Sequence, residues 1–186
     1  MDIQINDLSK SFGDKVIFKD FSFRFEDGVT TVISGESGCG KTTLLRIIAG
    51  LDRDYKGKIS PDKFTVSVAF QEPRLFPGAT VWENLAPFDK NGRAEELLIK
   101  LGIGKESFDI LPDELSGGMA RRVSLARAIL KDADVYLFDE PFAGLDAENA
   151  ENTAKIIKEY CEGKTCIAVT HNKELAEVFA HKFLYL

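Results

Sequence analysis

The hydrophobic pattern changes its period along the chain. Residues 3–5 and 21–25 alternate apolar and polar side chains, which is the period of half-buried β-strands. Further runs rich in β-branched and aromatic residues predict more strands, several of them buried. These runs cover residues 29–34, 64–70, 135–138 and 165–169, with a final candidate strand at 183–186.

Helical signals separate most of these strands. Thr80 with Glu83 three residues later resembles a capping box. Predicted helices cover residues 43–49, 81–85, 93–101, 116–130, 147–161 and 172–180. Strands that alternate with helices indicate βαβ units and a mostly parallel sheet, so we expect an α/β fold.

The 186 residues suit a single domain, 1–186. Residues 74–131 carry helical rather than strand signals, and we expect them to form a small inserted helical lobe. The α/β core would then consist of residues 1–73 and 132–186. Within it, residues 52–58 are interpreted as a polar connection.

Composition narrows the function classes. The net charge is −6, whereas a nucleic-acid or anionic-membrane surface needs clustered Lys and Arg. No apolar run approaches the about 20 residues of a membrane-spanning helix. The N-terminal residues lack the pattern of a signal peptide. We expect a cytosolic protein that neither binds nucleic acid nor inserts into a membrane.

Residues 35–42 (GESGCGKT) fit the phosphate-loop pattern G-x-x-x-x-G-K-[ST], between a predicted strand and a predicted helix. Backbone N–H groups of such a loop wrap phosphates, and the start of the helix adds favourable potential for an anion. Lys41 would reach the β- and γ-phosphates, and the Thr42 hydroxyl would bind Mg²⁺. The predicted nucleotide-binding residues here are Gly35, Glu36, Ser37, Gly38, Cys39, Gly40, Lys41, Thr42 and Thr43. The chain is predicted to bind a nucleoside triphosphate.

Two carboxylates end the apolar run at 135–138. In a phosphate-loop enzyme, the first carboxylate at such a strand end holds Mg²⁺, which assigns Asp139. Glu140 would then lie beside the attacking water as general base or water-positioning group.

A second anion site is predicted at Ser116-Gly117-Gly118. Ser116 is a good N-cap, and the two glycines bare the backbone N–H groups at the start of a helix. This helix is distant in sequence from the phosphate loop.

The three cysteines do not form a disulfide framework. Cys161, Cys166 and His171 loosely resemble metal-ligand spacing, but buried structural thiols are the favoured interpretation. Cys39 lies at a helix start that would stabilise a thiolate. A small residue tolerated in the loop is favoured there over redox control.

Taken in order, these elements resemble the nucleotide-binding subunit of an ATP-binding cassette (ABC) transporter, over nearly the whole chain. The resemblance implies a phosphate-loop NTPase (RecA-like) core with an N-terminal antiparallel β portion. It makes Phe12 the aromatic that stacks on adenine, and Gln71 the glutamine that touches the metal and links the site to the helical lobe. Residues 115–119 become the signature segment, followed by the loop 143–146 and by His171 as a γ-phosphate contact.

The resemblance also implies assembly and function. The catalytic set would be Glu140, His171, Lys41 and Gln71, with ATP and Mg²⁺ as cofactors and Thr42, Gln71 and Asp139 around the metal. A head-to-tail homodimer would place the signature of one copy, Ser116, Gly117 and Gly118, over ATP on the other. The expected role is an ATPase that drives solute transport through transmembrane permease subunits, at the cytoplasmic face of the membrane. A cytosolic ABC-type ATPase, or a nucleotide-dependent dimerisation module without a membrane partner, is the alternative.

Two features depart from the family pattern. Met119 replaces the usual glutamine of the signature, and the interval from Gln71 to Leu115 is short. The stretch 70–77 (FQEPRLFP) is similar to importer ATPases for nitrate, sulfonate or taurine-like anions, which favours import.

Overall fold

A computed structural model describes all 186 residues, with two β-sheets and six α-helices. The smaller sheet is antiparallel, and its three strands lie in the order β2–β1–β4. Its strands are β1 (Ile3–Phe12), β2 (Lys15–Phe25) and β4 (Lys56–Ser60). The predicted N-terminal antiparallel portion is confirmed.

The larger sheet is parallel throughout, and its five strands lie in the order β5–β6–β7–β3–β8. Its strands are β3 (Thr30–Ser34), β5 (Val66–Ala69), β6 (Val135–Asp139), β7 (Thr165–Val169) and β8 (Lys182–Tyr185). Because parallel strands need crossover connections, helices occupy the segments between most of them. The predicted parallel α/β fold is confirmed.

The helices begin and end close to the predicted positions. They are α1 (Lys41–Ile48), α2 (Val81–Leu85), α3 (Ala94–Lys100), α4 (Gly117–Leu130), α5 (Ala147–Cys161) and α6 (Lys173–Phe179). Short 3₁₀ turns cover Ala86–Phe88, Lys105–Ser107 and Pro112–Glu114. The capping box of α2 is present, since Thr80 and Glu83 each accept from the backbone N–H of the other.

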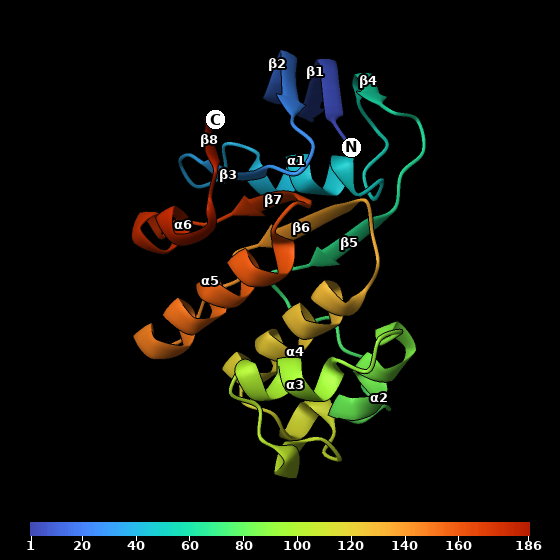
Figure 1. Cartoon of the computed structure of the whole chain (residues 1–186). Coiled ribbons are helices and arrows are strands. Elements are labelled where there is room, and N and C mark those ends of the chain that lie inside the picture. The colour runs from blue at the N-terminus through green and yellow to red at the C-terminus, as the bar shows by residue number, and fades with distance from the viewer.

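The central strands of the parallel sheet contribute to two separate hydrophobic cores. Alternate residues of a strand point to opposite faces, so Tyr136 and Phe138 pack with α2 to α6. Val135 and Leu137 pack on the opposite face with α1 and the antiparallel sheet. Figure 1 shows the resulting layers, with α1 between the two sheets and α4, α5 and α6 beyond the parallel sheet.

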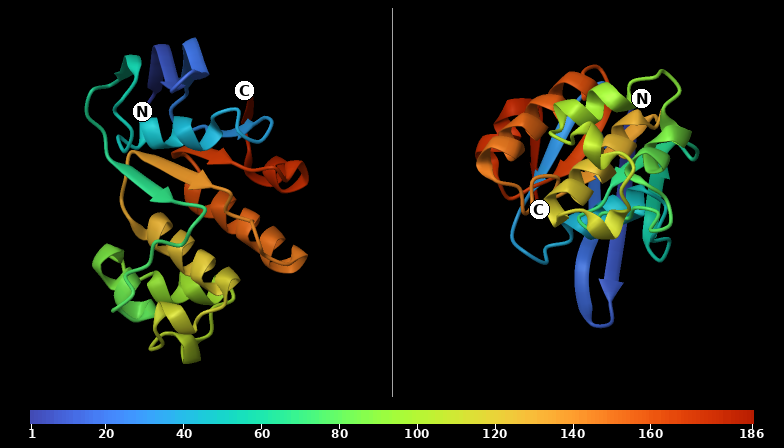
Figure 2. Two further views of the ribbon diagram at one scale, coloured as in Figure 1. Left: turned by 180° about the vertical axis from the view of Figure 1, so that it is seen from behind. Right: turned by 90° about the horizontal axis from the view of Figure 1, so that it is seen from below.

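The segment between β5 and β6 contains helices and 3₁₀ turns but no strand. Figures 1 and 2 show α2 and α3 at the end of the molecule opposite the antiparallel sheet, with α4 running from them to the parallel sheet. At that end of α4, the Ser67 hydroxyl on β5 donates to the Ala128 carbonyl at 2.7 Å. Helix α4 therefore connects the helical part of the molecule to the strand that precedes Gln71.

The predicted polar connection at 52–58 was wrong for residues 56–58, because Lys56–Ser60 is strand β4 paired with β1. Most of β4 is solvent-exposed, so its sequence has no apolar alternation that would reveal a strand. A Cβ at Gly57 would lie 2.6 Å from two carbonyl oxygens of β1, so close backbone approach explains this glycine. Strands β1 and β2 also extend well beyond the predicted 3–5 and 21–25. Register shifts interrupt the alternation of apolar and polar residues, so the pattern did not predict their full length.

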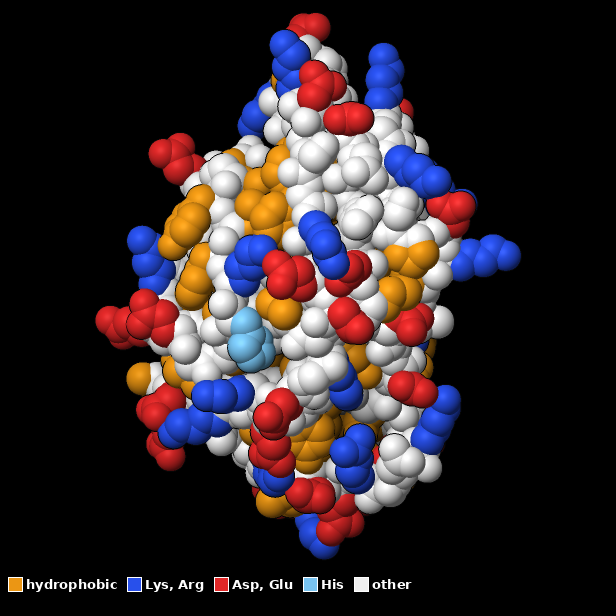
Figure 3. All heavy atoms as spheres, turned by 45° about the horizontal axis from the view of Figure 1, so that its top comes forward, with side chains coloured by type: hydrophobic (Ala, Val, Ile, Leu, Met, Phe, Trp, Pro, Cys, Tyr) orange, Lys and Arg blue, Asp and Glu red, His pale blue; other side chains and the backbone are white.

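No helix is both long and apolar enough to cross a bilayer. Acidic and basic side chains are interspersed over the face shown in Figure 3, rather than separated by sign.

A buried asparagine is predicted to stabilise the helical part of the molecule. The Asn84 side chain is fully buried; its amide nitrogen donates to the carbonyls of Phe76, Ala79 and Thr80, and its oxygen accepts from Phe76 N–H at 2.8 Å. Asn84→Ala leaves buried backbone groups unpaired and should lower the free energy of unfolding by about 1–3 kcal/mol in urea titrations. The exposed Asn91→Ala is the control. Equal stability of the two variants would contradict this assignment.

Candidate nucleotide-binding site

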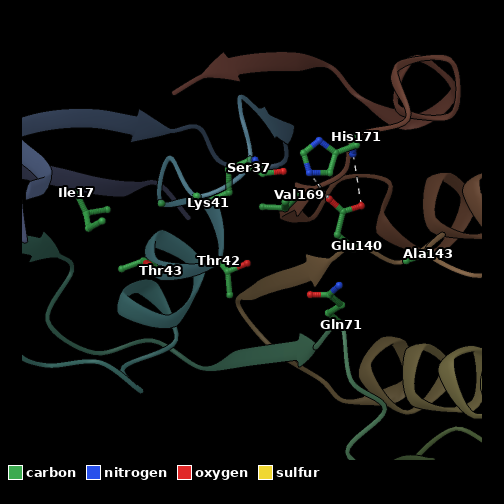
Figure 4. A pocket seen from close by; sticks show the side chains of 12 residues that line it. Ile17, Ser37, Lys41, Thr42, Thr43, Gln71, Glu140, Ala143, Val169 and His171 are labelled. Atoms are coloured by element: carbon green, nitrogen blue, oxygen red, sulfur yellow. Dashed lines mark hydrogen bonds and ion pairs between the residues drawn. The ribbon is translucent and has the colours of Figure 1, made fainter. Parts of the chain in front are cut away.

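A cavity of 460 Å³ opens at the carboxyl ends of the parallel strands, beside the start of α1. Its lining residues are Ile17, Ser37, Gly38, Gly40, Lys41, Thr42, Thr43, Gln71, Glu140, Ala143, Val169 and His171. Figure 4 shows the phosphate-loop residues on one side and Glu140 with His171 on the other. Crevices at this edge of an α/β sheet are the usual position for ligands.

The phosphate loop turns sharply into α1. Gly40 is the N-cap of α1 with φ 112°, a backbone conformation that other residues rarely adopt. A Cβ there would lie 2.5 Å from Ile17 Cγ2 and 2.8 Å from Phe18 Cζ. Only glycine therefore allows α1 to begin at this point, with its first N–H groups facing the cavity.

Lys41 is buried within the loop that it terminates. Its ammonium donates to the Gly35 carbonyl at 2.9 Å and to the Glu36 carbonyl at 2.8 Å, and lies 3.8 Å from Cys39 Sγ. The loop is thus closed around a cation by its own backbone.

Asp139 ends β6 and is buried beside α1. The Thr42 hydroxyl donates to Asp139 Oδ1 at 3.3 Å. Burial raises the pKa of Asp139, while the Thr42 hydrogen bond and the Lys41 charge act in the opposite direction. The Thr42 hydroxyl and the Gln71 amide line the cavity, and the Asp139 carboxylate lies directly behind Thr42. These are the hard oxygen donors that suit Mg²⁺. The structure contains no group of three or more His, Cys, Asp and Glu side chains that could hold a metal by themselves.

Glu140 is held in a strained backbone conformation, with φ 50°. Its N–H donates to the Val169 carbonyl at 2.9 Å, which fixes it at the end of β7. Oε2 accepts from His171 N–H at 3.4 Å, and the buried Oε1 has no hydrogen-bond partner, with His171 Nε2 3.4 Å away. Burial raises the pKa of Glu140, and the nearby His171 opposes that shift.

The structure brings most of the predicted residues together. Nine of them line the cavity, and Gly35, Glu36, Cys39 and Asp139 contact Lys41 or Thr42 behind its wall. Phe12 lies apart, 53% exposed, in a second hollow of 380 Å³ that shares Thr42 and Thr43 with the first.

Residues 116–118 line neither hollow. The Ser116 side chain caps α4 by accepting from Met119 N–H at 3.2 Å, so the helix start is formed but lies away from the cavity of its own chain.

Sequence reasoning missed three cavity residues as binding candidates. Ile17 and Val169 reach the cavity from strands, and Ala143 from the loop after Glu140. Their apolar side chains carry no chemical signal, and only the packing of sheets and loop places them there. Cys161 and Cys166 are free thiols buried in the core.

A family model described as "ABC transporter" matches residues 18–143, more than half of the chain. The chain belongs to the ABC transporter family. It is an ATP-binding ATPase of that family.

Curated ABC relatives match nearly the full chain. The aliphatic sulfonates import ATP-binding protein SsuB 1 of Streptomyces avermitilis is 36% identical over 190 residues, covering 99% of this chain and 72% of its own length. SsuB 2 of Paraburkholderia xenovorans is 38% identical over 192 residues, covering 99% and 76%.

Among solved ABC structures, the dimeric ABC transporter cassette MJ0796 aligns with a TM-score of 0.88 and 28% identity, covering 99% of this chain and 94% of that chain. A dimeric post-hydrolysis state of the same cassette, bound to ADP and Pi, gives 0.88 and 27%, with the same coverage.

The buried charge of Glu140 should destabilise this ABC ATPase when no nucleotide is bound. Because burial raises the pKa of Glu140 above its ordinary value, the folded chain binds the proton more tightly than the unfolded chain. Stability therefore falls as pH rises from the unfolded-state pKa to the folded-state pKa. Glu140→Gln removes this penalty and should raise the free energy of unfolding at neutral pH by about 0.5–2 kcal/mol.

Urea titrations over a range of pH check this. The gain should disappear below the unfolded-state pKa of about 4.3, where the carboxyl is protonated in both states. The exposed Glu177→Gln should show no gain. A stability loss in Glu140→Gln at neutral pH would contradict the assignment.

Proposed function

We propose that this chain is the ATPase subunit of an importer for small oxyanions of the aliphatic sulfonate class, acting as a head-to-tail homodimer against transmembrane permease subunits at the cytoplasmic face of the membrane. The observation that carries the dimer is the position of residues 116–118, a capped helix start outside the nucleotide cavity of its own chain. The named activity of the sulfonate importers and the dimeric form of MJ0796 support the proposal.

The nucleotide would lie across the two hollows. Phosphates would occupy the cavity beside residues 35–43, and adenine would stack on Phe12, because the hollows meet at Thr42 and Thr43. Lys41 would exchange its carbonyl partners for the β- and γ-phosphate oxygens.

Thr42, Asp139 and Gln71 are proposed to hold Mg²⁺. When bound, the ion supplies positive charge to the phosphate oxygens as negative charge develops on them. The raised pKa of Asp139 reflects a carboxylate buried without a full counter-charge, which a divalent cation would supply.

Hydrolysis would use Glu140 and His171 on the opposite wall. A water beside Glu140 would attack the γ-phosphorus as the bond to the bridging β–γ oxygen breaks, and Glu140 would accept the proton of that water. Its raised pKa brings it closer to the range of an effective general base. His171, 3.4 Å from the carboxylate, would orient Glu140 and donate to the γ-phosphate.

The open side of this site would be covered by the partner copy. Ser116, Gly117 and Gly118 of that copy would present hydroxyl and N–H donors to the γ-phosphate. ATP would then hold the dimer together, and hydrolysis would release it.

Glu140→Gln should keep ATP binding and lose on the order of 10²-fold or more in turnover, the scale for loss of a general base. Phosphate release measures turnover, and fluorescent ATP titration measures binding. Glu177→Gln, which changes an exposed carboxylate on α6, should behave as the parent chain. Unaltered turnover in Glu140→Gln would remove Glu140 from the mechanism.

Mixing two inactive variants tests the composite site. A Cβ at Gly117 would meet nothing within 4 Å, so Gly117→Arg should leave the subunit folded while disabling its signature segment. Lys41→Ala should disable the phosphate loop instead. Each variant alone should be inactive, but their mixture should recover about one quarter of the parent turnover, because about half of the dimers are mixed and each contains one complete site. A mixture that stays inactive, although both chains are folded, would contradict the head-to-tail dimer.

A further inference from the structure

Arg121, in the second turn of α4, contacts two segments that border the nucleotide cavity. Its Nε donates to the Gln71 carbonyl at 3.2 Å, and its Nη1 donates to the Ala143 carbonyl. Gln71 and Ala143 both line the cavity, Gln71 below Glu140 and Ala143 beside it in Figure 4. One guanidinium therefore connects both segments to the helix that begins with the signature residues.

The loop 143–146 is shaped to accept this contact. Gly144 has φ 72°, and a Cβ there would lie 2.8 Å from Arg121 Nη1, so a larger residue would displace the guanidinium. The loop also has its own hydrogen bonds, from Ala143 N–H to the Glu140 carbonyl and from Leu145 N–H to the Phe142 carbonyl. Its turns therefore do not require Arg121.

The next residue fixes the far end of the same loop. Arg122 Nη1 donates to Asn149 Oδ1 at 2.5 Å, and the Asn149 amide nitrogen donates to Asp146 Oδ2 at 2.7 Å. Helix α4 thus holds residues 143–146 at both ends. Arg122 is buried and also donates to the Leu101 carbonyl at 2.8 Å, so its removal would disturb packing. Arg121 is half-buried and bonds to Gln71 and Ala143 alone.

We propose that Arg121 is a positioning residue that transmits occupancy of the chain's own nucleotide cavity to its signature segment. A guanidinium is planar and presents its donors at fixed angles. It keeps both carbonyl contacts only while Gln71 and Ala143 hold one spacing relative to α4. A triphosphate that moves either cavity wall therefore moves the first turn of α4. The importance of this motion for the opposite ATP site rests on the proposed dimer.

The test uses amide hydrogen exchange of the monomer, in a Glu140→Gln background and at a concentration where light scattering shows single chains. The readout is the ATP-induced change in exchange at Met119 and Ala120, whose N–H groups bond to Ser116 in the first turn of α4. We expect ATP to change these rates about 5-fold or more, the lower range of allosteric coupling. Arg121→Ala should abolish the change while ATP affinity stays within about 2-fold of the background.

Three control variants separate the effect of the paired Arg121 contacts from the effect of removing a positive charge. Arg24→Ala removes an exposed arginine that pairs with Asp2, far from the cavity, and should leave the response intact. Arg121→Lys keeps the positive charge but lacks the planar guanidinium, and it should lose the ATP-induced change in exchange as Arg121→Ala does. Gly144→Ala displaces the guanidinium from the loop side and should give the same loss without changing Arg121.

An ATP response that survives in Arg121→Ala would overturn the proposal. So would full rescue by lysine, or a fall in ATP affinity parallel to the loss of the response. Because single chains are measured, failure to dimerise would overturn the proposed assembly, but the exchange result would still test the role of Arg121. In the chain with Glu140 intact, we expect Arg121→Ala to lower kcat with KM unchanged.

Discussion

Two carboxylates buried at the end of one central strand impose the main constraint on this molecule. Asp139 and Glu140 have raised pKa values because burial outweighs the few groups that face them. A site of this kind costs stability when empty, and the surrounding fold must offset that cost. The offset comes from β6, which lies between β5 and β7 and packs on both faces, with Tyr136 and Phe138 toward one core and Val135 and Leu137 toward the other.

The same arrangement leaves the signature segment outside the nucleotide cavity of its own chain. The start of α1 packs closely against Ile17 of β2, and the Thr42 hydroxyl of α1 donates to Asp139 at the end of β6. The phosphate loop and the carboxylates are therefore held next to each other. Helix α4 reaches this layer with its C-terminal end, while its capped N-terminus lies elsewhere. Each chain therefore carries a phosphate loop with its carboxylates at one place and the capped start of α4 at another. Two chains related by a twofold axis can combine these parts into two sites.

The sequence was sufficient wherever a residue type is dictated by local geometry or local chemistry. The phosphate loop, the carboxylates after an apolar strand and the caps of α2 and α4 could be recognised because each is a short pattern with one physical purpose. Strand β4 could not, because its exposed residues form a strand only through pairing with β1. The contribution of Ile17 and the contacts of Arg121 were equally hidden, since both depend on segments distant in sequence.

The hydrogen bonds from Lys41 to the carbonyls of its own loop would compete with hydrogen bonds to a phosphate. The ammonium already has two carbonyl partners, so under the proposed function an arriving triphosphate would replace existing bonds instead of organising a loose segment. The entropic cost of ordering the loop would therefore be small. The enthalpic gain would be the difference between the phosphate contacts of Lys41 and its carbonyl contacts. The same exchange would assist release of a phosphate, because Lys41 could return to the two carbonyl oxygens. Lys41 would thus have hydrogen-bond partners both before phosphate binding and after phosphate release, which would lower the free-energy cost of each step.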